Sequence, residues 1–471
     1  MGKKTFLSIF SLVFILLFVF LDVPLLLRLS FFINYLLLWF ITYYNIYIEK
    51  RFSPFIGTFV VFNLLFFVAA PLVQISSIMQ RGFQGTGKHI QNLPFSEFGV
   101  FRANTYILIF ILTFFISYLY LKKLKFNFNI NKRIPYNNTP LVLVVLAVIS
   151  LVIIATNFST IVFQYKNDFY KEVEQTSLSS YLMVQKFLFF IPLAGLFISH
   201  YYLKDATKKT KNYFFVIGLL LCFLLFVLIL KNPLTEKRNA LGPIYITLIY
   251  LFYRKSLDSN FKVIKFMFFS MVLLFPIVSI ITHARISLRE IVSKENFLAE
   301  SAKTMNIENA FNSLHYDAYP CFLATIDYCD RNDITYGKQL VPVFFFFVPR
   351  SSWHDKPEVT GFKIGNYLID SYGFNFNNLA NPYVSEAYIN FGLFGIILFA
   401  IILAMIFVWQ MRWIDSNDRL KSIFAFYFSI YLIYFLRGDL ANTYMLILST
   451  FVAVVVFPKG LYLLVNYYAK K

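Results

Sequence analysis

Twelve long apolar runs follow one another along this chain, and they constrain its fold more than any other feature. A membrane-spanning helix needs about 20 mostly apolar residues, and it satisfies its own backbone hydrogen bonds inside lipid. Hydrophobic residues fill 59% of the 471 positions and charged residues only 14%, so a soluble domain is disfavoured. We therefore predict an all-α, polytopic transmembrane helical bundle. The predicted spans are residues 5–21, 25–48, 55–79, 104–121, 140–156, 182–203, 213–230, 242–253, 263–282, 386–410, 420–436 and 440–457.

The basic residues lie mainly between these runs, on alternate sides of the membrane. With the N-terminus in the cytoplasm, the cytoplasmic segments hold about twice as many Lys and Arg residues as the short outside segments. This asymmetry follows the positive-inside rule and predicts that both termini are cytoplasmic. The formal charge of +19 is thus explained by membrane orientation, and no nucleic-acid partner is expected.

One connecting segment is much longer than the others. Residues 283–385 form a loop that is predicted to lie outside the membrane, after spans 1–9 in residues 1–282. Spans 10–12 and a cytoplasmic tail follow in residues 386–471. Within the loop, residues 298–329 have apolar positions at helical spacing. Residues 341–349 are apolar and bracketed by prolines, and we expect them to enter the outer membrane interface.

Several classes of function lack their characteristic residues here. The predicted spans are nearly free of charge, which disfavours ion-coupled transport. There is no glycine-rich phosphate loop, no Asp-x-Asp pair and no His/Cys cluster with metal-ligand spacing. We therefore predict no cofactor and no metal. Cys321 and Cys329 share the outer loop and would either form a disulfide, if oxidised, or remain free thiols.

Four arginines are predicted at the outer membrane face, where the positive-inside rule disfavours them. The planar guanidinium binds phosphate oxygens in bidentate fashion, so the set predicts an anionic, lipid-linked phosphate or pyrophosphate. Any one of them could instead be solvated or contact lipid phosphates. The four residues are Arg238, Arg285, Arg350 and Arg437.

Three segments late in the chain resemble the O-antigen polymerase family, which polymerises oligosaccharide repeat units. Residues 349–357 have the sequence PRSSWHDKP, residues 386–392 have EAYINFG, and residues 437–439 form an Arg-Gly-Asp turn. The span layout and the late outer loop are also similar, and the resemblance covers most of residues 100–460.

The resemblance implies a bacterial glycosyltransferase with a fold similar to membrane glycosyltransferases that use polyprenyl donors. Such enzymes act at the outer leaflet of the cytoplasmic membrane on glycans linked to undecaprenyl pyrophosphate. They transfer the growing chain to the next lipid-linked unit and need no nucleotide. The implied partners are these lipid-linked oligosaccharides, membrane lipids, a flippase and a chain-length regulator.

A mechanism follows from this resemblance. The four arginines would stabilise the charge on the departing pyrophosphate, and a general base would accept the proton of the acceptor hydroxyl. Glu386 is the first candidate for the base, although a carboxylate at a helix N-terminus is also favoured by the helix dipole. Asp439 is a second candidate and could equally pair with Arg437. The other candidates are His315 and Asp317.

Three alternative functions remain open. A lipid-linked oligosaccharide flippase is also polytopic and basic, but the long outer loop and the uncharged spans disfavour it. An O-antigen ligase shares the layout and the donor, and it transfers the glycan to a lipid A core sugar. The third alternative is a structural scaffold of a polysaccharide export complex.

Overall fold

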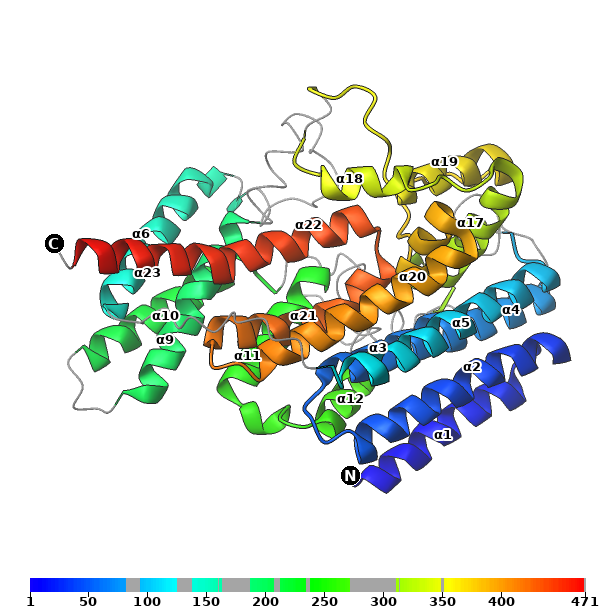
Figure 1. Ribbon diagram of the computed structural model, residues 1–471, viewed down its shortest axis with the longest axis horizontal. Helices are drawn as coiled ribbons and strands as arrows, with labels where there is room; N and C mark the ends of the chain where they lie inside the picture. Colours follow the sequence, from blue (N-terminus) through cyan, green and yellow to red (C-terminus); the bar gives the residue numbers. More distant parts are fainter. Residues whose placement is uncertain are drawn as a thin grey trace, which may run out of the picture. The chain divides into compact units, whose positions relative to one another are not determined.

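A computed structural model describes most of the chain (Figure 1). Its described residues are helical and contain no strand, which confirms the predicted all-α class. The described ranges are 1–81, 94–124, 138–159, 161–162, 187–206, 212–233, 238–271, 311–312, 314–348 and 351–469.

Nine helices in the described ranges are long and apolar enough to cross a membrane, as expected of a multi-pass membrane protein. They match nine of the twelve predicted spans. The other three predictions correspond in part to shorter helices, α9 (Ile191–Asp205), α11 (Arg238–Phe252) and α12 (Asn260–Phe269). The nine long helices are Lys3–Phe20, Leu25–Ile48, Pro54–Gln80, Glu97–Leu121, Thr139–Thr156, Tyr213–Leu230, Tyr383–Ile414, Arg419–Arg437 and Leu440–Tyr468.

The chain forms two compact units whose segments alternate along the sequence. The first unit comprises Met1–Leu124, Lys255–Trp409 and Leu432–Thr443, and the second comprises the remaining residues. The late outer loop therefore belongs with the early helices. The first unit contains α1 (Lys3–Phe20), α2 (Leu25–Tyr43), α3 (Pro54–Leu64), α4 (Ala70–Arg81), α5 (Glu97–Leu121), α12, α17 (Ala318–Asn332), α18 (Val341–Phe344) and α19 (Thr360–Tyr372).

The second unit contains α6 (Thr139–Thr156), α9, α10 (Tyr213–Leu230), α11 and α23 (Phe457–Tyr468). Three further helices pass from one unit to the other along the chain. Short π-helical turns continue α2, join α3 to α4, and join α22 to α23. The three shared helices are α20 (Tyr383–Ile414), α21 (Arg419–Arg437) and α22 (Leu440–Phe451).

The helix α3 lies at the centre of the first unit, and all of its residues are buried. Its Phe59 ring stacks on Phe114 of α5 with centroids 4.1 Å apart, and Phe407 of α20 packs edge-on against Phe114. The opposite face of α5 exposes apolar side chains such as Leu112 and Ile116, which suit contact with lipid. The unit therefore has a dry aromatic core and a lipid-compatible exterior.

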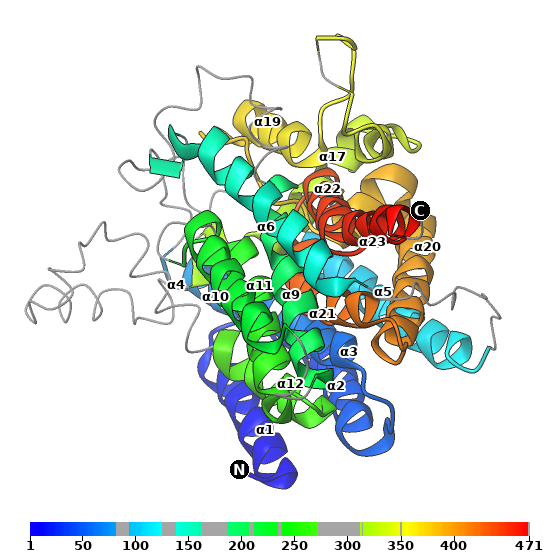
Figure 2. The ribbon, with the colours of Figure 1, turned by 90° about the vertical axis from the view of Figure 1, so that its left-hand side faces the viewer.

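Residues 283–385, the loop that is predicted to lie outside the membrane, contribute α17, α18 and α19, and α17 packs against both α5 and α19 (Figure 1 and Figure 2). The helix α17 confirms the C-terminal part of the pattern predicted over residues 298–329, whereas residues 298–310 lie outside the described residues. Cys321 and Cys329 are buried free thiols on this one helix. Eight residues separate them, or about 12 Å along the axis, so they cannot form a disulfide with each other.

The segment that we expect at the membrane interface forms the four-residue helix α18 followed by turns. Phe344, Phe345 and Phe347 all expose large parts of their rings. Three exposed phenylalanines within four positions fit the prediction that this segment enters the membrane interface.

The helix α20 is sharply kinked at Gly392, which has φ 61° and ψ −142°. Residues with a Cβ atom rarely adopt this conformation. A Cβ at Gly392 would still have room, because its closest neighbour is the Ile334 Cγ2 atom at 3.9 Å. The glycine is therefore required by the backbone and not by packing.

We predict that Gly392→Ala destabilises the folded protein by about 1–3 kcal/mol, because alanine is strained at this backbone conformation. Gly218→Ala is the matched control, since Gly218 lies in α10 and its added Cβ meets nothing within 4 Å. Thermal unfolding of the detergent-purified variants would measure both effects. An unchanged melting temperature for Gly392→Ala would show that the kink is not intrinsic to the folded chain.

Candidate functional site

Residues Arg437–Leu440 form a turn between α21 and α22, and this turn contacts the outer loop in two places. At its first residue, the Arg437 Nη2 atom donates to the Leu314 carbonyl oxygen and to Asp317 Oδ1, both at 2.9 Å. The guanidinium carbon lies 6.0 Å from the centre of the Phe66 ring. An ion pair between Arg437 and Asp317 thereby joins the turn to the start of α17. The Asp317 side chain in this pair is only 5% exposed.

Arg437 keeps donors that this ion pair does not use. Its Nε atom is buried and has no hydrogen-bond partner among the described residues. Both hydrogen bonds of the guanidinium to the start of α17 use the single Nη2 atom. A buried N–H without an acceptor costs about 1–3 kcal/mol, so this group would gain from an anionic ligand beside it.

Two buried carboxylates lie at the other end of the same turn. Glu386, in the first turn of α20, accepts a hydrogen bond from Thr360 Oγ1 at 2.7 Å and one from the Leu440 backbone N–H at 3.3 Å. It is 1% exposed. Glu386 thus links the starts of α19, α20 and α22.

Asp439 precedes α22 and caps it. Its Oδ1 atom accepts from the Ala441 N–H at 3.0 Å, and its Oδ2 atom accepts from the Gly361 N–H at 2.8 Å. Gly361 is required for this approach, because a Cβ atom there would lie 2.3 Å from the Leu379 carbonyl oxygen. Burial raises the pKa of Asp439, and the N–H donors that it accepts from oppose the shift.

Glu386 and Asp439, which we call the acid pair, can accept a proton from a substrate only if they become accessible. Thr360 and Gly361, at the start of α19, occupy one oxygen of each carboxylate. A substrate hydroxyl would have to displace one of these donors. The site therefore combines a cation with unused donors and two carboxylates that α19 covers.

The structure brings together four of the eight residues predicted for the site, namely Glu386, Asp439, Asp317 and Arg437. His315 lies in the helical turn Leu314–Tyr316, two residues before Asp317. The alternative that Arg437 pairs with Asp439 is wrong, because the ion-pair partner of Arg437 is Asp317.

The structure does not describe the side chains of the other three predicted arginines. Arg238 begins α11 in the second unit, and its side chain is not among those described. Arg285 and Arg350 lie outside the described residues. In the parts of the chain that are described, no group of three or more His, Cys, Asp or Glu residues could hold a metal ion.

Sequence reasoning missed Thr360 and Gly361, which hold the two carboxylates. Nothing in the local sequence marks them, because their role depends on contacts with residues that are 26 and 78 positions away. The Leu314 carbonyl was missed for the same reason.

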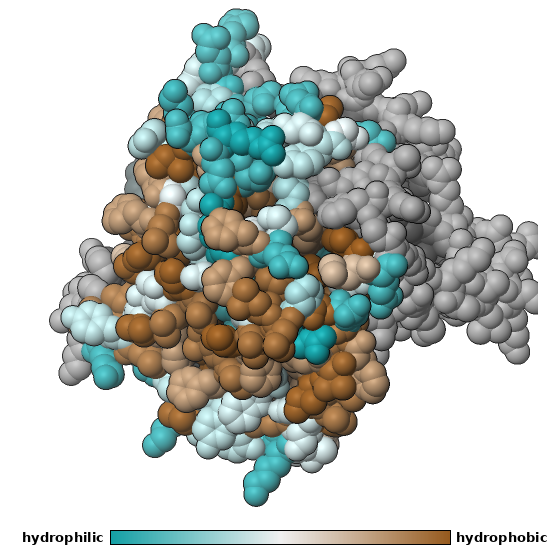
Figure 3. All heavy atoms as spheres, turned by 90° about the vertical axis from the view of Figure 1, so that its right-hand side faces the viewer, coloured by the Kyte–Doolittle hydropathy of each residue, from teal (hydrophilic) through white to brown (hydrophobic). Residues whose placement is uncertain are grey.

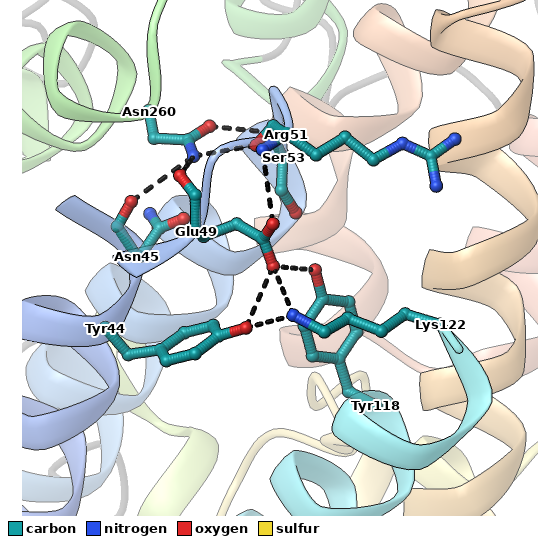
Figure 4. A network of polar contacts seen from close by, with 8 residues as sticks. All are labelled: Tyr44, Asn45, Glu49, Arg51, Ser53, Tyr118, Lys122 and Asn260. Carbon is teal, nitrogen blue, oxygen red and sulfur yellow. Dashed lines mark hydrogen bonds and ion pairs between the residues drawn. The ribbon is translucent and has the colours of Figure 1, made fainter. Parts of the chain in front are cut away.

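A second polar cluster lies beyond the C-terminal end of α5 (Figure 4). The Glu49 Oε2 atom accepts from Tyr44 at 3.1 Å, from Tyr118 at 3.0 Å and from the Lys122 ammonium at 2.8 Å. Burial alone would raise the pKa of Glu49, but Lys122, the Arg51 N–H and Tyr118 outweigh it and lower the pKa. The charged forms of Glu49 and Lys122 therefore stabilise each other.

Asn260 completes this cluster and attaches α12 to it. Its side-chain amide donates to the backbone oxygens of Asn45, Glu49 and Arg51 and accepts from the Ser53 N–H (Figure 4). The contacts of this network join the ends of helices to the segment between α2 and α3. We interpret this cluster as structural.

Comparison of the sequence and the structure with family models, curated proteins and solved structures finds no match. The function must therefore be argued from the geometry of the site.

We predict that Lys122→Met destabilises the protein by about 1–3 kcal/mol, because it leaves the Glu49 carboxylate buried without its cation. Lys123→Met is the matched control, since Lys123 is the exposed neighbour. A lowered carboxyl pKa stabilises the fold above the ordinary value of 4.5, and this contribution is lost as the pH falls through the lowered pKa. The difference in melting temperature between variant and wild type should therefore narrow below pH 4.5. A difference that is constant from pH 7 to pH 3 would contradict the ion pair.

Proposed function

We propose that this protein is a glycosyltransferase that polymerises oligosaccharide repeat units linked to undecaprenyl pyrophosphate, as O-antigen polymerases do. The observation that carries the proposal is the convergence of Arg437, Asp439, Glu386 and Asp317 at one turn, from remote segments of the chain. About twelve spans with both termini in the cytoplasm would put this turn at the outer leaflet of the bacterial cytoplasmic membrane.

In this proposal Arg437 binds the pyrophosphate of the donor. Asp317 fixes the guanidinium through Nη2, and the remaining N–H groups donate to phosphate oxygens. The glycosidic C–O bond to the pyrophosphate breaks, so negative charge grows on the leaving group. A preorganised cation at that position stabilises the transition state more than the ground state.

The acceptor hydroxyl gives its proton to one of the two buried carboxylates as its oxygen bonds to the anomeric carbon. Glu386 is the first choice for this base, and Asp439 is the second. Burial raises the pKa of Asp439, which makes this carboxylate a stronger proton acceptor than one in water. The start of α19 must move away from the pair before the hydroxyl can enter.

We predict that Arg437→Ala lowers long-chain glycan by about 100- to 1000-fold, because removal of one transition-state donor has this effect in other enzymes. Gel analysis of glycan from a deletion strain that expresses the variant would measure it, with membrane protein level as a check. Single-repeat glycan should persist. Arg254→Ala, an exposed arginine that is predicted to be cytoplasmic, is the matched control and should give normal chains.

The double variant Arg437→Gln, Asp317→Asn separates catalysis from folding. It replaces the ion pair by two neutral amides of similar shape that can still hydrogen-bond. Restored long chains in this variant would show that Arg437 is structural and would refute the proposal. If the deletion strain lacks even single-repeat glycan on its lipid A core, the protein is a ligase.

A further inference from the structure

A groove of about 250 Å³ lies between the start of α5, the middle of α17 and the end of α19. It belongs to the first unit and is separate from the Arg437 turn. These helices come together on the face shown in Figure 3, where hydrophilic residues gather above a large apolar area. The residues of the groove that matter here are Phe98, Arg102, Ile326, Asp327, Asp330 and Tyr372.

The polar groups of the groove are held in fixed positions. Asp327 Oδ2 accepts hydrogen bonds from the hydroxyls of Tyr367 and Tyr372, the latter at 2.6 Å. Burial and the neighbouring Asp327 raise the pKa of both tyrosines, so they remain hydrogen-bond donors. The other oxygen, Oδ1, has only a long contact of 3.5 Å with Arg331. An ionised carboxylate has about four acceptor sites, so Asp327 keeps acceptor capacity for a ligand.

Arg102 of α5 and Asp330 of α17 form an ion pair that joins these two helices beside the groove. The Nε atom of Arg102 is buried and has no hydrogen-bond partner in the described part of the chain. The Arg102 side chain is 22% exposed, so its guanidinium supplies a partly accessible cation beside two carboxylates. Arg102 and Arg331 pair with the two carboxylates, so the groove has no excess of cations to attract a phosphate.

Phe98 supplies a flat apolar surface to the same groove. Its side chain is 73% exposed although it lies on a helix with a well-packed opposite face. The guanidinium carbon of Arg102 lies 5.8 Å from the centre of its ring. An aromatic face beside fixed carboxylate and guanidinium groups suits a ligand with one apolar face and several hydroxyls.

We propose that this groove binds one neutral sugar residue of a lipid-linked glycan. The carboxylate of Asp327 accepts hydrogen bonds from the sugar hydroxyls, Arg102 donates one, and Phe98 packs on the C–H face of the ring. The groove volume of about 250 Å³ lies below the range of about 300–1,000 Å³ typical of pockets for drug-sized ligands, so it fits a single ring. That the sugar belongs to a lipid-linked glycan rests on the proposed function. That the groove binds a sugar does not.

Saturation-transfer NMR on the full-length protein in phosphatidylcholine nanodiscs tests this inference. The probes are the methyl glycosides of glucose, galactose, mannose, rhamnose and N-acetylglucosamine. At least one should receive saturation. Phe98→Ala and Asp327→Asn should each weaken its binding by tenfold or more.

The controls are Phe101→Ala, another partly exposed phenylalanine of α5, and Asp333→Asn, an exposed carboxylate that directly follows α17. Both should bind like the wild type. Binding of none of the glycosides, or equal binding by all variants, would overturn the inference. Competition by glycerol phosphate as strong as that of the glycosides would also overturn it and indicate a lipid headgroup site.

The two proposals fail separately. If the protein binds a sugar but Arg437 is dispensable for long-chain glycan, the proposal for the groove stands and the proposal of a polymerase fails. A requirement for Arg437 without sugar binding would do the opposite.

Discussion

In the first unit, the starts of α17, α19, α20 and α22 depend on the hydrogen bonds made by one turn, Arg437–Leu440. Its arginine holds the start of α17, and its aspartate holds the start of α19. The Leu440 N–H, at the start of α22, donates to Glu386 at the start of α20. In each of these contacts a charged group meets a polar group at low exposure, where an unpaired partner would be costly. The turn therefore fixes segments that are far apart in the sequence.

The same contacts limit the chemistry. Two carboxylates that are 1% and 6% exposed cannot meet a substrate while Thr360 and Gly361 cover them. Arg437 differs, because its side chain is 19% exposed, although its unpaired Nε atom is buried. If the protein transfers glycans as we propose, the donor pyrophosphate can bind before α19 moves. The acceptor can react only afterwards.

The apolar runs predicted the helices well because the requirement of lipid is local: each span must satisfy its own backbone. The kink at Gly392 was not predictable, since a glycine in an apolar helix gives no sign of a positive φ. The position of Arg437 at a span end followed from the sequence. Its pairing with Asp317 did not, because 120 residues separate them and only the folded outer loop brings them together.

The helix α19 relates the proposed sugar groove to the acid pair. Thr360 and Gly361 at its start bind Glu386 and Asp439, and Tyr372 at its end lines the groove. Twelve residues of helix separate the two ends by about 18 Å, which is more than one sugar ring can span. A sugar in the groove therefore cannot be the one that reacts at the acid pair. If both proposals hold, the groove binds a sugar several positions along the glycan, and the reacting end of that glycan lies at the turn.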